Sequence, residues 1–134
     1  MKLRILLFDG RGVISDNLDV FTKQLEAGAL FKFVFKLSVN LDDETIIFNL
    51  AIAAPPMEHF TIIDRLHSQL KGKTPIIELG NLGGGYLEMK DGCLVFCRSS
   101  SKFGPYKVEL LKKVEEAIKT FFGVTEVKYL TDCA

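Results

Sequence analysis

The sequence has no excess of either charge, because 17 lysine and arginine residues balance 17 aspartate and glutamate residues. Proteins dedicated to nucleic acids usually carry a strong basic excess, so the balance argues against that class of partner. No window approaches the roughly 18 apolar residues of a membrane-spanning helix. The apolar run in MKLRILLFDG is too short for a secretory signal. We therefore expect a cytoplasmic protein with no nucleic-acid or membrane partner.

Cysteine and histidine are also scarce, with three and two residues. No C-x-x-C pair occurs, and in one extended strand Cys93 and Cys97 would lie about 13 Å apart, beyond the roughly 7 Å reach of a disulfide. With His59 and His67 as the further candidates, no zinc pattern emerges. We expect the thiols to be apolar filler in a reducing compartment, and we predict no metal and no cofactor.

What the sequence does contain is enough apolar material for a core. A chain of 134 residues that is 48% hydrophobic can fold without disulfides or metal, so we predict a single domain over residues 1–134. Periodicity predicts an α+β domain whose mixed sheet has about six or seven strands, packed with two main helices and an N-terminal helix. The strands are expected at residues 3–8, 29–39, 45–54, 74–82, 86–89, 93–97 and 124–130, and the helices at 18–27, 57–71 and 105–122.

Three local patterns are distinct. Phe31, Phe33 and Phe35 fall on one face of an expected strand, and Lys32 and Lys36 fall on the other, which is typical of a strand with one buried face. Asp91-Gly92 is the dipeptide that a two-residue hairpin turn favours. The three glycines at 83–85 are expected to break a strand, because consecutive glycines more often mark a bulge or tight bend.

Two strand-to-helix junctions could bind an anion. The N-terminus of a helix exposes backbone N–H groups and the positive end of its dipole. His59 lies in the first turn of one predicted helix, where this positive end favours the neutral imidazole. Ser99, Ser100, Ser101 and Lys102 precede the other helix. The alternatives are a surface or capping histidine and an ordinary serine-rich turn.

A longer pattern follows from these segments. The run LGGGYLEMKDGCLVFCRSSSKFGPYK, followed by a helix and a strand, resembles the protein phosphohistidine phosphatases of the Janus/Ocnus family. That family has a leucine and three glycines, a hairpin, and a Y-S-x-A-Y-G-P loop that enters a helix. Ser100 and residues 103–105 match the loop. The segment EHFTIIDRLHSQL matches the one in which the catalytic histidine opens a helix, at His59, and LFKFVFKL matches the first core strand with its lysine, at Lys32.

The resemblance covers roughly residues 30–131, so residues 1–28 form a strand-helix extension. It implies a phosphohistidine-phosphatase-like fold and metal-independent hydrolysis of the N–P bond of phosphohistidine, on a phosphorylated protein or a small phosphoramidate. His59 would act as general base on water, or as a transient phospho-acceptor. The residues that would bind phosphate are Lys32, Phe60 through its backbone N–H, Ser99, Ser100, Ser101 and Lys102.

The sequence differs from the family at several positions. Tyr86 stands where the family has an arginine after the glycines, and Ser101 and Lys102 replace a methionine and an alanine. Two alternatives to an enzyme therefore stay open. One is a phosphate-binding or phosphoprotein-binding module without catalysis. The other is an interaction protein that forms a homodimer, since eleven phenylalanines and a mean hydropathy of +0.21 are generous for a small monomer.

Overall fold

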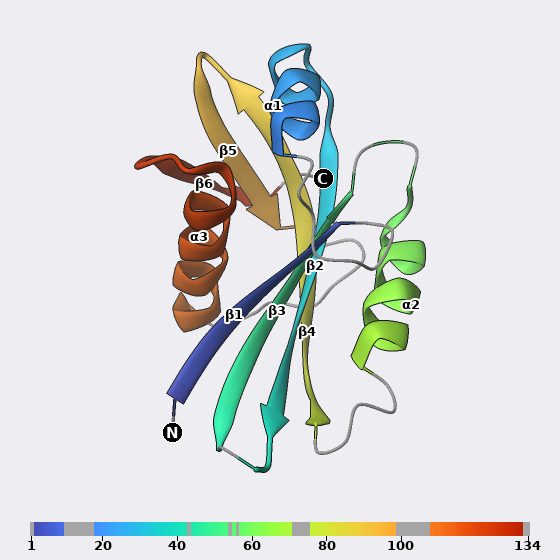
Figure 1. Ribbon diagram of the computed structural model, residues 1–134. Coiled ribbons are helices and arrows are strands. Elements are labelled where there is room, and N and C mark those ends of the chain that lie inside the picture. The colour runs from blue at the N-terminus through green and yellow to red at the C-terminus, as the bar shows by residue number, and fades with distance from the viewer. Residues whose placement is uncertain are drawn as a thin grey trace.

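The chain folds around one mixed sheet, seen in a computed structural model that describes residues 2–9, 18–42, 44–53, 55, 57–70, 76–98 and 108–132. The strands are β1 (Lys2–Asp9), β2 (Phe31–Asn40), β3 (Thr45–Ala53), β4 (Ile76–Lys90), β5 (Cys93–Arg98) and β6 (Val127–Asp132). They lie in the order β1-β3-β2-β4-β5-β6 (Figure 1). The two outermost pairs are parallel and the three inner pairs are antiparallel.

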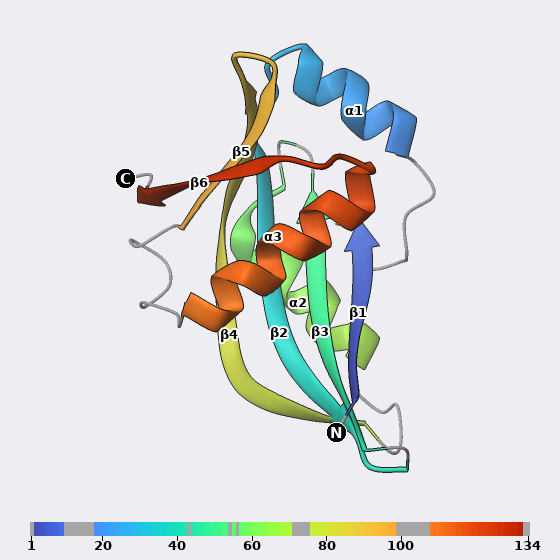
Figure 2. The same ribbon diagram turned by 90° about the vertical axis from the view of Figure 1, so that its left-hand side faces the viewer.

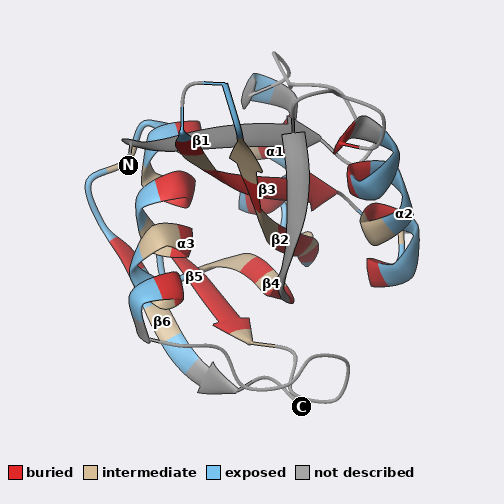
Figure 3. Ribbon diagram, turned by 90° about the horizontal axis from the view of Figure 1, so that it is seen from below, coloured by how far each residue is buried: buried red, intermediate tan, exposed pale blue. Residues whose placement is uncertain are grey.

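Helices cover both faces of this sheet. They are α1 (Leu18–Glu26), α2 (His59–Leu70) and α3 (Val108–Phe122). α1 and α3 lie over one face and α2 lies over the other (Figures 1 and 2). The buried residues of α2 and α3 face the sheet, as Figure 3 shows. The predicted α+β class with a mixed sheet is thus confirmed. None of the described helices is long and apolar enough to cross a membrane.

The start of α2 differs slightly from the prediction. The helix was expected from residue 57, but its first helical residue is His59. The N–H of Ile62 donates to the carbonyl oxygen of Glu58 at 3.1 Å, which makes Glu58 the N-cap residue. His59 therefore opens the helix. Two other predicted boundary residues, Gly72 and Pro105, lie outside the described residues.

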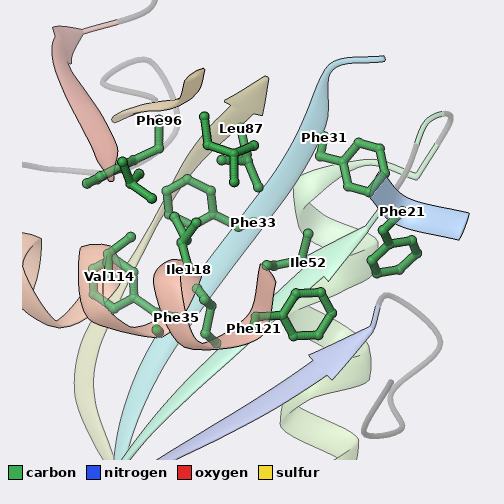
Figure 4. Packing of buried hydrophobic residues seen from close by; sticks show 14 of the residues in the cluster. Phe21, Phe31, Phe33, Phe35, Ile52, Leu87, Phe96, Val114, Ile118 and Phe121 are labelled. Carbon is green, nitrogen blue, oxygen red and sulfur yellow. The ribbon is translucent and has the colours of Figure 1, made fainter. Parts of the chain in front are cut away.

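The larger core forms between the sheet and the α1–α3 layer. Phe31, Phe33 and Phe35 of β2 are fully buried in it, as their alternation predicted. Phe33 and Phe35 lie beside Ile118 and Val114 of α3, whereas Phe31 lies beside Phe21 of α1 (Figure 4). A smaller core on the opposite face packs the apolar stripe of α2 against the sheet; its buried members are Val34, Ala51, Ala53, Ile62, Leu66 and Leu70.

The glycine triplet lies inside β4 and does not interrupt it, so the expected break is wrong. Gly85 is the register partner of Phe33, and Gly83 is the partner of Phe35. A Cβ atom at Gly83 would overlap the ring of Phe35, and one at Gly85 would overlap the carbonyl oxygen of Cys97. The glycines thus make room for large rings on the neighbouring strand, a pairing that keeps the sheet intact.

The described elements of the N-terminal segment, β1 and α1, both contact the same sheet. β1 pairs in parallel with β3 over all eight of its residues. The ring of Phe21 in α1 meets Phe31 edge-on with a centroid distance of 5.2 Å, and it lies 5.9 Å from the ring of Phe121. The predicted N-terminal extension therefore supplies an edge strand and one wall of the larger core.

The β4–β5 turn offers a clean test of backbone strain. Asp91 and Gly92 both have positive φ, at 52° and 77°, as the predicted two-residue turn requires. A Cβ atom at Gly92 would meet nothing within 4 Å. Gly92→Ala should therefore lower the free energy of unfolding by about 1 kcal/mol, through strain alone. Urea denaturation measures this, and an unchanged midpoint would contradict the turn geometry.

Candidate functional site

His59 is the buried centre of the candidate site. It opens α2, its side chain is completely buried, and Nε2 lies 2.8 Å from the carbonyl oxygen of Gly85. A carbonyl oxygen can only accept, so Nε2 carries the proton in this bond. A neutral ring then has its lone pair on Nδ1. The bond to Gly85, in the centre of the sheet, therefore leaves Nδ1 as the nitrogen that can act as a base.

Lys32 lies beside the start of the same helix. Its Nζ is 2.7 Å from Oε2 of Glu58, the residue before His59. The lysine side chain is only 18% exposed, whereas that of Glu58 is 60% exposed. The ammonium group is thus held near the base of the site, and the carboxylate lies closer to solvent.

A second set of contacts connects Lys32 and His59 to β4. Lys32 and Tyr86 are register partners in the β2–β4 ladder. The ring of Tyr86 meets the imidazole of His59 edge-on, with a centroid distance of 5.0 Å and an interplanar angle of 86°. Tyr86 follows Gly85, the hydrogen-bond partner of His59. The structure therefore brings Lys32 and His59, 27 positions apart in sequence, into one cluster.

The side chain of Phe60 lies on the exposed surface at the start of α2. Phe60 is the second residue of α2, so its backbone N–H lies at the N-terminus of the helix. Its side chain is 66% exposed. The structure thus confirms that Phe60 lies in the first turn of this helix, and its role in anion binding stays a prediction.

The predicted phosphate loop is not part of the described structure. Ser99, Ser100, Ser101 and Lys102 all lie outside the described residues. Arg98, which precedes them, is the register partner of Gly85. The described part of β5 therefore ends beside the residue that binds His59.

Three residues of the cluster were not predicted to act in the site. Glu58 pairs with Lys32, Gly85 binds His59, and Tyr86 packs on it. The position of Glu58 could have been predicted from the sequence, because a negative residue is favourable at the N-terminus of a helix. Gly85 and Tyr86 belong to the segment that carries the family resemblance, but their contacts with His59 join parts of the chain that are far apart in sequence and were not predicted.

The cysteine expectation needs a correction. Cys97 is disulfide-bonded, and Cys93 is a free, half-buried cysteine. Spacing excluded a bond between these two residues, but it said nothing of a bond to another segment. The expectation of a reduced thiol is therefore wrong at Cys97. Disulfides persist mainly in oxidising compartments, so the cytoplasmic location stays a prediction without support from this residue.

Other features of the described structure lie away from the cluster. No group of three histidine, cysteine or acidic residues placed to hold a metal ion occurs among the described residues. A cavity of about 350 Å³ lies between the β4–β5 turn and the α3–β6 connection, lined in part by Met89, Cys93, Val124 and Glu126. None of the predicted site residues lines it.

Comparison of the chain with protein-family models, with curated proteins and with solved structures finds no match.

Proposed function

We propose that the protein is a phosphohydrolase that cleaves the N–P bond of phosphohistidine, on a protein or a small phosphoramidate. The observation that supports it best is the convergence of His59 and Lys32 at the N-terminus of α2. A base, a cation and a helix N-terminus are the groups that phosphoryl transfer needs for positioning and charge stabilisation. The resemblance to the Janus/Ocnus phosphatases supplies the substrate class.

In this proposal His59 acts through Nδ1. Water attacks phosphorus, the new O–P bond forms, and Nδ1 accepts a proton from the water. The P–N bond breaks, and its electron pair returns to the imidazole of the substrate, which takes up a proton from solvent as it leaves. Nδ1 of His59 then releases the proton that it accepted to solvent, which restores the neutral base. The products are inorganic phosphate and histidine. The bond from Nε2 to Gly85 orients the ring and fixes the tautomer throughout.

Three groups would stabilise the negative charge on the phosphoryl oxygens. Lys32 supplies the ammonium, the backbone N–H of Phe60 supplies a helix N-terminus, and the segment Ser99–Lys102 supplies hydroxyls and a second cation. Since no part of His59 is exposed, a substrate reaches the imidazole only after the residues that cover it have moved. We therefore propose that phosphate binding includes such a movement.

A lysine substitution tests the phosphate site. Lys32→Ala removes the cation and should lower kcat/KM for a phosphohistidine peptide by about 100-fold, the usual effect of losing one group that stabilises the transition state. Fold stability should change little, because the partner carboxylate is largely exposed. Phosphate release measures the first effect, and thermal unfolding measures the second.

Lys36→Ala is the matched control. Lys36 lies on the same face of β2, about 13 Å along the strand. Its removal deletes the same charge away from His59, so activity should stay within about twofold of the wild type. Equal losses in the two variants would show a general charge effect and would contradict the assignment of Lys32.

A binding module without catalysis is the second candidate, and the complete burial of His59 favours it. A buried imidazole that bonds Gly85 and packs on Tyr86 can serve to fix α2 on the sheet. In that case calorimetry would detect binding of inorganic phosphate that Lys32→Ala weakens, while the wild type would release no phosphate from any phosphohistidine substrate.

A further inference from the structure

The ion pair between Lys32 and Glu58 places a carboxylate inside the proposed phosphate site. Nζ of Lys32 lies 2.7 Å from Oε2 of Glu58. A phosphoryl oxygen bound to Nζ at an ordinary distance would lie at most about 5.5 Å from that carboxylate oxygen. This is shorter than the Debye length of about 8 Å at physiological salt, so the two anions repel each other. One lysine cannot neutralise both a carboxylate and a phosphoryl dianion.

The exposures of the pair show where a further cation could enter. Lys32 is mostly buried, whereas 60% of the Glu58 side chain is exposed. Phe60 and Thr61, at the start of α2, are exposed as well. The carboxylate thus lies on the exposed surface at the start of α2, which a side chain flanking the phosphohistidine can reach. A cation brought there by the substrate would form an ion pair with Glu58 when the phosphoryl group binds Lys32.

We propose that Glu58 is a specificity-determining residue that selects phosphohistidine flanked by a lysine or arginine. This inference rests on the proposed hydrolysis of phosphohistidine. The resting ion pair is exchanged for two new ones, Lys32 with the phosphoryl group and Glu58 with the basic residue of the substrate. A neutral neighbour offers Glu58 no cation in exchange for Lys32, and an acidic neighbour adds a further repulsion.

Three phosphohistidine peptides that differ in the flanking residue, as Lys, Gln or Glu, test this inference. The wild type should hydrolyse the Lys peptide with a kcat/KM about fivefold above that of the Gln peptide, and the Glu peptide should be slowest. Glu58→Gln should lower the Lys-to-Glu ratio at least fivefold, chiefly because the Glu peptide is hydrolysed faster. The ratio is the decisive readout, because an N-cap role of Glu58 alone would not change it.

Asp64→Asn is the matched control, since it removes one negative charge from an exposed position of the same helix about 9 Å along its axis. It should leave the ratio unchanged. An equal gain by Glu58→Gln on all three peptides would show that the carboxylate only competes for Lys32, and it would overturn the inference. So would a ratio that Glu58→Gln does not alter. If the wild type hydrolyses none of the peptides, the proposed function fails and the inference fails with it.

Discussion

His59→Ala is expected to lower kcat for phosphohistidine hydrolysis by about 10²- to 10⁴-fold, the usual contribution of a positioned general base. The imidazole is the group in the described cluster that can accept a proton from water near neutral pH. Removing it also removes the hydrogen bond to Gly85 and leaves a cavity under the N-terminus of α2. Single-turnover phosphate release measures the loss, and circular dichroism reports whether the helix persists.

Two variants separate the chemical role of His59 from its structural role. His59→Gln keeps a side-chain N–H that can donate to Gly85 but lacks a basic nitrogen. His67→Ala removes the other histidine, which is exposed on the same helix. We expect His59→Gln to be inactive and folded, and His67→Ala to resemble the wild type. A folded His59→Gln variant with normal turnover would refute the assignment of the base.

Gly85→Ala should have the largest effect on stability, with a loss of about 3 kcal/mol in the free energy of unfolding. The new methyl group would overlap the carbonyl oxygen of Cys97 and would lie 3.0 Å from the ring of Phe33. The first neighbour is backbone of the adjacent strand, so relief requires a shift between β4 and β5. The same shift moves the carbonyl oxygen that binds His59. Urea denaturation measures the stability, and phosphate release measures the damage to the site.

Gly92→Ala is the control for this prediction. It strains the hairpin turn without a steric clash and away from His59. If Gly92→Ala keeps full activity while Gly85→Ala loses it at a temperature where both are folded, the loss arises in the site. A Gly85→Ala variant as stable as the wild type would contradict the close approach of β4 and β5.

Local patterns carried most of the fold prediction. The burial of the phenylalanines on one face of β2 and the Asp91-Gly92 turn follow from a few residues each, and both are confirmed. The burial of Val34 on the opposite face of β2 was not expected. The continuity of β4 through its glycines is not local. It depends on Phe33 and Phe35 lying opposite Gly85 and Gly83, a register that joins positions about 50 residues apart. Glycines by themselves predict a break in a strand. The large phenylalanine rings that fill the space beside them come from another strand, and only the structure shows this pairing.

The residues of the candidate site also differ in how far the sequence predicts them. His59 could be found from its position at a helix start, whereas Lys32 came from the family resemblance and not from its spacing. Glu58 and Tyr86 were not predicted as site residues, because a surface acid and a strand tyrosine are common in any sequence. What distinguishes them is contact with Lys32 and His59 across three elements. The loop from Ser99 to Lys102 and the homodimer stay predictions.

The arrangement of parallel and antiparallel pairs also bears on how the chain folds. Lys90 and Cys93 pair across the β4–β5 turn, only three positions apart, whereas Lys2 and Thr45 pair across 43 positions. Closing a short loop costs less chain entropy than closing a long one. We therefore expect the β2–β3 and β4–β5 hairpins to form first. Lys32 and Gly85 lie in different hairpins, and the nearest pair that joins these hairpins, Asn40 with Ile76, spans 36 positions. The candidate site is then completed only when the two hairpins pair, so it forms together with the long-range contacts of the sheet and not before them.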